Sequence, residues 1–449
     1  TPSWPPSRAG VSMSVDSPAG QFTQLCDRYL AAQDINAQFA AIQAVHQVLS
    51  QQSQRREAVQ SPIMRVFVEK LFNPVLASFN PDGNQRTSAV LTFGVGHDIR
   101  VTRAHCLCLI PFTQLDTQQN VELFHATIHI LQFDTREVGI AIHNVLLRYT
   151  GQENLPERYR IELITYCKYL LDNGREAFRA LPSMHSNKDQ HPMAIQAPYF
   201  VSRVNLYIGR QFEELLTPTR ALSDETKQRI VELSQCCVNY VCMDLNPSMY
   251  VGHMMLWREV LHAKVAMIAL LPNVSHIFRD MMTEPYLARL APSTTLILRS
   301  APTDMYIMRN TVLHALRAIF FISPPTGGPS QRGVEPIVMA FRQYLPQISC
   351  ERHLIGDPIL DTTTYSWNMI HFCDIAHKAR EKMASRDLVM LALFLTRQIG
   401  SLYLPLWVQG ICLKVLKVIP LAIPKVIEEQ NKLVREEEEN LKRDRERER

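Results

Sequence analysis

The sequence predicts an all-α protein, an irregular α-solenoid of stacked antiparallel helix pairs, and three observations lead to that prediction. Apolar residues recur at helical spacing in one segment after another. Strand signals are hard to find, since no serial alternation of apolar and polar residues is joined by Asn-Gly or Asp-Gly turns. The expected helices are separated by only a few residues. Such short links make neighbouring helices antiparallel, so each pair can bury its apolar faces by stacking on the next.

Composition agrees with a folded repeat protein and excludes several functions. The chain has 449 residues, of which 46% are hydrophobic and 20% charged. A chain of this length exceeds one ordinary core, so we expect several domains or one extended array. The formal charge of +4, from 47 basic and 43 acidic residues, is too balanced to indicate a nucleic-acid or membrane partner. Ten scattered cysteines and no secretory signal favour an intracellular, reducing compartment.

Five segments follow along the chain. Residues 1–20 are rich in Pro, Ser and Gly and are predicted to be a disordered lead-in. The first half of the solenoid covers 21–181, with helices expected near 101–112, 118–132, 134–150 and 156–181. A polar loop is expected at 182–197, followed by the second half of the solenoid at 198–427, with a further loop at 323–333. Residues 428–449 are predicted to be a charged helix or a disordered linker.

Local signals mark where helices begin and end. Short polar caps or a first-turn proline predict helix starts at Ser61-Pro62, Ser223-Asp224-Glu225, Asn246-Pro247 and Ser385-Arg386-Asp387. Glycines predict loops at Gly83, Gly151 and Gly174. The helix pairs repeat roughly every 35 to 45 residues, which is typical of HEAT or armadillo solenoids.

The search for catalytic or metal chemistry leads to the expectation of no catalytic, cofactor-binding or metal-binding residue. Gly94-Val95-Gly96 lacks the third glycine and the preceding strand of a nucleotide-binding turn. Cys236, Cys237 and Cys242 lack zinc-ligand spacing and are expected in the core. Cys373 and His377, in a group with His371 and Asp374, fall one helical turn apart, but two ligands do not hold a metal.

Two further groups are interpreted as surface features. His185, Asp189 and His191 lie in the expected polar loop, where solvated side chains are the rule. Five arginines are spread over several helices: Arg100, Arg103, Arg299, Arg309 and Arg317. They are expected on solvent faces, and the alternative is that they line a groove of the solenoid.

Two collinear blocks carry a resemblance to a known family. The first is SPIMRVFVEKLFNPVLASF at Ser61–Phe79, together with residues 100–151; the second spans 344–420 and contains Leu354-Ile355-Gly356 and Tyr365-Ser366. The charged run from Glu428 follows in the same order. The chain thereby resembles the N-terminal HEAT region of the transformation/transcription domain-associated (TRRAP/Tra) family, the PI3-kinase-related (PIKK) pseudokinase scaffolds of SAGA-type and NuA-type histone acetyltransferase complexes. Residues 182–303 match this family poorly beyond being helical.

The resemblance implies a non-catalytic scaffold segment of a nuclear transcription coactivator. Its implied partners are acetyltransferase complex subunits and transcription activators, with no direct nucleic-acid, membrane or small-molecule partner. The family's kinase-like module lies outside these residues, and we expect the chain to be part of a longer protein. Two alternatives stay open, namely another HEAT-type adaptor, such as a nuclear transport receptor or a phosphatase scaffold, and an enzyme with an unrecognised site.

Overall fold

The fold is all-α, as the sequence predicts. The computed structural model describes residues 17–54, 60–79, 94–151, 155–184, 192–218, 221–243, 254–277, 306–321, 361–380 and 383–447, together with 289–290, 293–294, 297 and 355. No strand occurs among these residues. They divide into two compact units, each described by itself: the residues up to Pro156 form the first, together with Pro192 and Met193, and the residues from Glu157 onward otherwise form the second.

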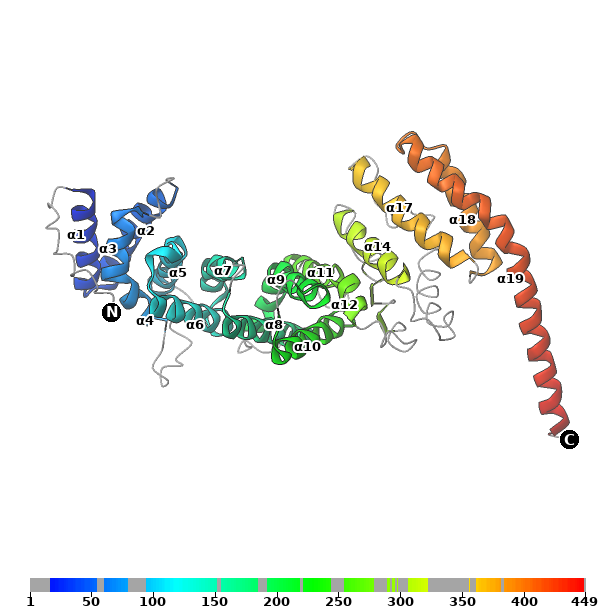
Figure 1. The fold of residues 1–449 in the computed structure, drawn as a ribbon, viewed down its shortest axis with the longest axis horizontal. Coiled ribbons are helices and arrows are strands. Elements are labelled where there is room, and N and C mark those ends of the chain that lie inside the picture. The colour runs from blue at the N-terminus through cyan, green and yellow to red at the C-terminus, as the bar shows by residue number, and fades with distance from the viewer. Residues whose placement is uncertain are drawn as a thin grey trace. The chain divides into compact units, whose positions relative to one another are not determined.

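The first unit consists of short and medium helices (Figure 1). Residues with apolar side chains at helical spacing bury one face of each helix, as Ile42, Val45 and Leu49 do. Within one layer α2 packs on α5 and α5 packs on α7, while α1 packs on α2 and α3, and α6 on α7. This nearest-neighbour packing is that of a helical repeat. The elements are α1 (Pro18–Ala31), α2 (Ile35–Ser53), α3 (Pro62–Phe67), the π-helical turn η2 (Val68–Phe72), α4 (Asn73–Ala77), α5 (Val95–Leu109), the 3-10 turn η3 (Phe112–Gln114), α6 (Thr117–Phe133) and α7 (Arg136–Thr150).

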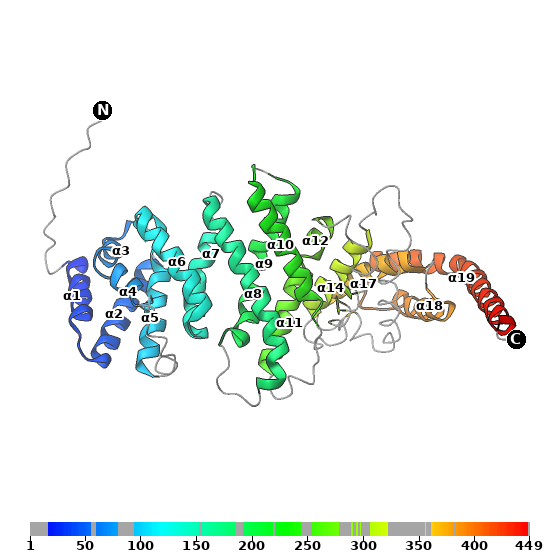
Figure 2. The ribbon, with the colours of Figure 1, turned by 90° about the horizontal axis from the view of Figure 1, so that it is seen from below.

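The second unit repeats this arrangement with longer helices (Figures 1 and 2). One succession of contacts runs from α11 to α14, then to α17 and α19. Around it, α8 packs on α10, α12 on α14, and α18 on α19. The elements are α8 (Glu157–Met184), α9 (Pro192–Leu216), α10 (Asp224–Val241), α11 (Met254–Ile268), α12 (Leu271–Ile277), α14 (Tyr306–Phe321), α17 (Thr362–Ala379), α18 (Ser385–Ile399) and α19 (Leu406–Arg447).

Side-chain caps explain where several helices begin. The Asp116 carboxylate accepts a bond from the Gln119 amide at 2.7 Å, and the Gln119 side chain accepts one from the Asp116 amide at 3.1 Å. This reciprocal capping box satisfies two amides that α6 itself cannot pair. Ser223 caps α10 through the Thr226 amide at 3.2 Å, and Asp361 caps α17 through the Thr364 amide at 3.0 Å. The predicted starts at Ser61-Pro62 and Ser223-Asp224-Glu225 are confirmed, although the Ser61 side chain makes no capping bond.

Some boundaries differ from expectation. Gly174 lies inside α8 rather than ending it, because the packing of α8 on α10 outweighs the weak helix propensity of one glycine. α8 continues to Met184 and α9 begins at Pro192, so helix occupies both ends of the expected 182–197 loop. The predicted start at Ser385 is confirmed, although Ala384 occupies the cap position and makes no side-chain bond. Residues 1–16, Gly83, Asn246-Pro247 and the 323–333 loop lie outside the described residues.

The charged segment is helical. α19 runs from Leu406 to Arg447 without a break at 428, which matches the helix alternative and not the linker alternative. Pairs such as Glu428 and Lys432 are four residues apart, a spacing that stabilises an exposed helix. Leu406–Pro424 is, by length and composition alone, apolar enough to cross a membrane, and less than a third of that stretch is buried.

Candidate docking groove

A groove of about 840 Å³ lies among α9, α11 and α14 of the second unit. Its walls combine charged, polar and apolar side chains from three segments that are far apart in the sequence. α9 contributes Tyr199, Ser202, Arg203 and Asn205; α11 and the turn after it contribute Arg258, Glu259, His262, Val265, Ala266 and Ala269; α14 contributes Ile307, Met308 and Thr311.

An arginine stacked on a tyrosine forms the α9 wall. The Arg203 guanidinium carbon lies 3.4 Å from the centre of the Tyr199 ring. Its Nη1 also donates to the Tyr199 carbonyl at 3.2 Å. The two residues are one helical turn apart, so the stack forms within α9 itself. Contact with the ring face and one hydrogen bond hold the guanidinium in place while leaving most of its planar fork of donors for a partner.

The α11 wall adds a second cation and a neutral imidazole. Arg258 and Glu259 carry opposite charges, so together with Arg203 the groove has two cations and one anion. Burial lowers the pKa of His262, and the nearby Arg258 and Arg203 lower it further. His262 is therefore uncharged near neutral pH and offers one donor and one acceptor. The charges of the groove suit a ligand with more carboxylates than cations.

The rest of the lining is apolar. Val265 and Met308 are buried, while Ile307 is exposed at the edge. Ala266 and Ala269 are small, so the helix surface at these positions leaves room for a side chain from outside. A mostly apolar concavity with a few fixed polar groups is the usual form of a binding site. The arrangement can bind a peptide segment through apolar contacts and carboxylate–arginine pairs.

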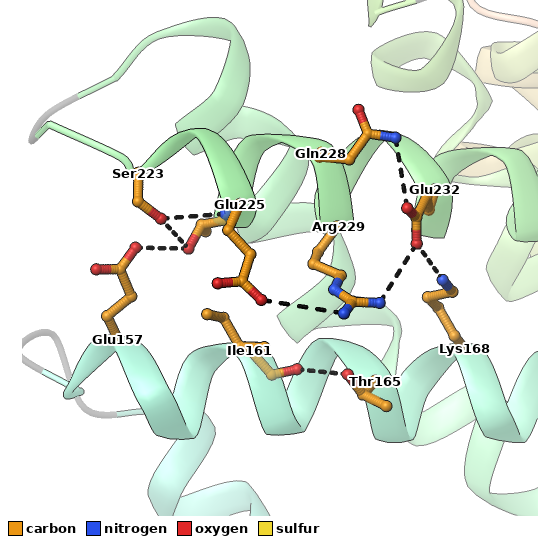
Figure 3. Close-up of polar contacts among 10 residues, drawn as sticks. Glu157, Ile161, Thr165, Lys168, Ser223, Glu225, Gln228, Arg229 and Glu232 are labelled. Atoms are coloured by element: carbon orange, nitrogen blue, oxygen red, sulfur yellow. Dashed lines mark hydrogen bonds and ion pairs between the residues drawn. The ribbon is translucent and has the colours of Figure 1, made fainter.

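Polar contacts join α8 to α10 in the same unit (Figure 3). The Thr226 hydroxyl donates to Glu157 at 2.7 Å, and hydrogen bonds from Ser223 and Thr226 lower the pKa of the Glu157 carboxyl. A second cluster pairs Lys168 of α8 with Glu232 of α10. Hydrogen bonding from Lys168 lowers the pKa of Glu232. All of these contacts join the two helices to each other, so we assign them a structural role.

The glycine at position 94 and the cysteines at 236, 237 and 242 have structural explanations. Gly94 has a positive φ of 90° and directly precedes α5, whose first residue is Val95. The left-handed conformation explains a glycine there, because other residues adopt it at a cost. Cys237 is fully buried, and Cys236 and Cys242 are partly buried, which agrees with packing positions.

Cys373 and His377 do not converge on a common site. Cys373 is fully buried and its sulfur lies 3.8 Å from that of Cys412 in α19. His377 is exposed on another part of α17. Among the described residues, no group of three or more His, Cys, Asp or Glu side chains is arranged to hold a metal ion. His185, Asp189 and His191 lie outside the described residues.

The expectation that the scattered arginines decorate solvent faces is wrong for most of them. Arg309 is fully buried in α14. Arg100 pairs with Asp134 and also donates to the Ser78 carbonyl at 3.1 Å. Arg103 donates to the Tyr29 hydroxyl at 2.6 Å, and Arg317 to Asp374 at 2.6 Å. Arg100 and Arg103 each reach partners on two segments, because a guanidinium carries several donors. Arg299 lies outside the described residues.

No family model and no curated protein matches this sequence significantly. The groove residues were not identified from the sequence. Tyr199, Arg258 and Ile307 are more than forty residues apart from one another in the chain, and only the packing of α9, α11 and α14 brings them together. The spacing of Tyr199 and Arg203 at one helical turn is the one local signal that was available.

Proposed function

We propose that this chain is a non-catalytic scaffold segment of a nuclear transcription coactivator, which holds histone acetyltransferase complexes together and offers a docking surface for transcription activators. The groove among α9, α11 and α14 is the observation that carries the docking part of this proposal. Its apolar lining and two arginines suit an amphipathic peptide of net negative charge. The resemblance of 61–79, 100–151 and 344–420 to the family of acetyltransferase scaffolds supplies the identity of the partners.

A helical repeat suits a scaffold for a physical reason. Among the described helices, the strongest contacts join elements close in the chain, as in the succession α11, α14, α17 and α19, so the array presents a long surface built from many separate segments. Different partners can then bind at different places without competing for one pocket. No step of this function requires a cofactor, a metal or a nucleophile.

Affinity capture with the full chain tests the scaffold proposal. We expect subunits of histone acetyltransferase complexes among the captured proteins, identified by mass spectrometry from nuclear extract. Replacing both Arg203 and Arg258 by glutamate should lower the recovery of transcription activators, because the groove would change from two cations and one anion to three anions. Arg397→Glu on α18 is the control for charge reversal elsewhere, since Arg397 is also exposed but does not line the groove.

Two outcomes would count against the proposal. If no acetyltransferase subunit is captured under conditions that keep the chain folded, the assignment to these complexes fails. If the purified chain instead binds a Ran-type GTPase, the alternative of a nuclear transport receptor is favoured. Equal activator recovery by the groove variant and the Arg397→Glu control would remove the groove from the proposal.

A further inference from the structure

A row of aromatic rings crosses α14, α17 and α19 and ends in two exposed tryptophans. The ring centres of His314 and His371 are 5.3 Å apart, and those of His371 and Trp367 are 6.4 Å apart. Trp367 in turn lies 6.5 Å from Trp407, at an interplanar angle of 69°. Trp367 is 51% exposed, Trp407 is 57% exposed, and Leu406, the residue before Trp407, is 83% exposed. We call Trp367, Leu406 and Trp407 the tryptophan patch.

The patch lies at one end of two parallel helices. α17 and α19 run in the same direction, because the contact of Trp367 with Trp407 is followed further along both helices by the contact of Cys373 with Cys412. Lys414 is seven residues after Trp407, which is close to two full turns. Lys414 therefore lies on the same side of α19 as Trp407, about 10 Å further along the helix.

α18 leaves the tryptophan patch uncovered, since it packs on the other side of α17. The rings of Phe372 and Phe394 are 5.3 Å apart, and the Tyr365 hydroxyl donates to Gln398 at 3.0 Å. A helix turns by about 100° per residue, so Trp367, two positions after Tyr365, points away from α18. Large apolar side chains that gather on an exposed surface indicate a binding site, and tryptophan often contributes most of the binding energy of an interface.

The surroundings of the tryptophan patch are basic. Residues 406–427 of α19 contain three lysines and no acidic residue. Two of these lysines, Lys414 and Lys417, are exposed. On α17 the one acidic residue, Asp374, is paired with Arg317. An apolar patch next to cations is complementary to a partner that carries both an apolar side chain and carboxylates.

We propose that the tryptophan patch is a second docking surface, which binds an acidic helix of a protein partner. The helix lies along α19, with an apolar side chain on Trp407 and carboxylates opposite Lys414 and Lys417. The two lysines are seven and ten residues after Trp407, or roughly 10 and 15 Å along the helix axis. The same spacing in the partner helix sets its apolar and acidic residues on one side. The patch shares no residue with the groove among α9, α11 and α14, so this inference does not rest on the groove.

An anionic membrane fits this surface less well. Leu406–Pro424 is apolar enough to cross a membrane by length and composition, but α17 and α18 pack against α19. α19 also continues past α17 and α18 (Figure 1) into residues 428–439, which contain six glutamates and only two bases. Because both parts belong to one helix, a membrane along the first part would bring these glutamates close to anionic headgroups, which repel them.

Fluorine NMR of the full chain, labelled with 5-fluorotryptophan, tests the proposal at the residues concerned. The probe is a capped helical peptide of about 17 residues with one phenylalanine and with glutamates seven and ten positions before it. This order places the glutamates near the start of the peptide helix, where its macrodipole favours them. We expect the signals of Trp367 and Trp407, assigned with Trp→Phe variants, to shift on titration, while the signal of the buried Trp257 stays in place.

Charge reversal tests the role of the lysines. Lys414→Glu should raise the dissociation constant of the peptide about fivefold. Lysine in place of the facing glutamate of the peptide should restore binding to this variant. Two controls should leave the titration of the Trp407 signal unchanged: the groove variant with both Arg203 and Arg258 replaced by glutamate, and Leu393→Ala, which truncates a leucine of α18 that is 56% exposed.

Several results would overturn the proposal. It fails if neither patch signal moves, or if only Trp257 responds, which would place the peptide elsewhere. It also fails if Lys414→Glu binds the peptide as well as the unchanged chain does, or if the charge exchange restores nothing. Binding to phosphatidylserine vesicles that is lost in Trp407→Ala, without binding of the peptide, would assign the patch to a membrane instead.

Discussion

Truncation of a single buried leucine in α7 measures how firmly the first unit is packed. Leu146 is 1% exposed and lies in the helix that packs against both α5 and α6. Leu146→Ala removes three carbon atoms, and their transfer from water accounts for about 2.4 kcal/mol at ~0.8 kcal/mol each. A cavity of roughly 80 Å³ that did not collapse would add about 2 kcal/mol. We expect a loss of about 3 kcal/mol in the free energy of unfolding.

The neighbouring residue is the matched control. Leu147 is 40% exposed, so its truncation leaves a depression that water fills rather than a closed cavity. Leu147→Ala should cost less than about 1.5 kcal/mol. Both variants have the same chemistry, the same helix and nearly the same helix propensity, which isolates burial as the variable.

Urea unfolding followed by far-ultraviolet circular dichroism gives the two free energies, and hydrogen exchange with mass spectrometry locates the change. Because repeats interact with their neighbours only, faster exchange in Leu146→Ala should be confined to α5, α6 and α7. Equal losses in the two variants, or a loss below 1 kcal/mol for Leu146→Ala, would refute the packing argument.

Three further predictions concern ionisable groups. Burial raises the pKa of Cys26 to about 12, so iodoacetamide at pH 8 should modify it only after unfolding, as peptide mass spectrometry can show. Hydrogen bonds lower the pKa of the Glu157 carboxyl. The ionised carboxylate therefore stabilises the fold above its ordinary pKa near 4.5, and this stabilisation is lost as the pH falls below that value. Glu157→Gln should lose less stability than wild type between pH 6 and pH 3.5. Burial and the nearby His314 and Arg317 lower the pKa of His371 to about 4, although Asp374 acts in the opposite direction. As the pH falls, the unfolded chain therefore binds a proton at this histidine before the folded chain does. The melting temperature should then fall from pH 6.5 to pH 4 more steeply in wild type than in His371→Gln. Parallel pH curves for variant and wild type would contradict either of the last two.

Most of the fold could be predicted from local signals. Helices expected at 118–132 and 134–150 occur at Thr117–Phe133 and Arg136–Thr150, because their apolar period is regular and their links are short. The cap at Ser223 could also be predicted from the sequence, because its hydrogen bond joins residues only three positions apart. The loop predicted at Gly174 was wrong because α8 is stabilised by its contacts with α10, which lie far away in the sequence.

The groove and the buried arginines could not be predicted in this way. Arg309 and Arg203 are both arginines on apolar-periodic helices, yet one is fully buried and the other lines an open groove. What separates them is the position of neighbouring helices, which depends on packing between distant segments. Composition near each residue carries no information about that packing.

The two prolines inside α19 have a mechanical consequence. Pro420 and Pro424 supply no amide hydrogen, so the carbonyls of Leu416 and Pro420 lack their usual helical donors. The helix is therefore most compliant where its packed first half meets the half that extends beyond α17 and α18. A force applied near Arg447 would bend α19 at residues 420–424. The second half of the helix would then change direction, while the packing of the first half on α17 and α18 stays as it is.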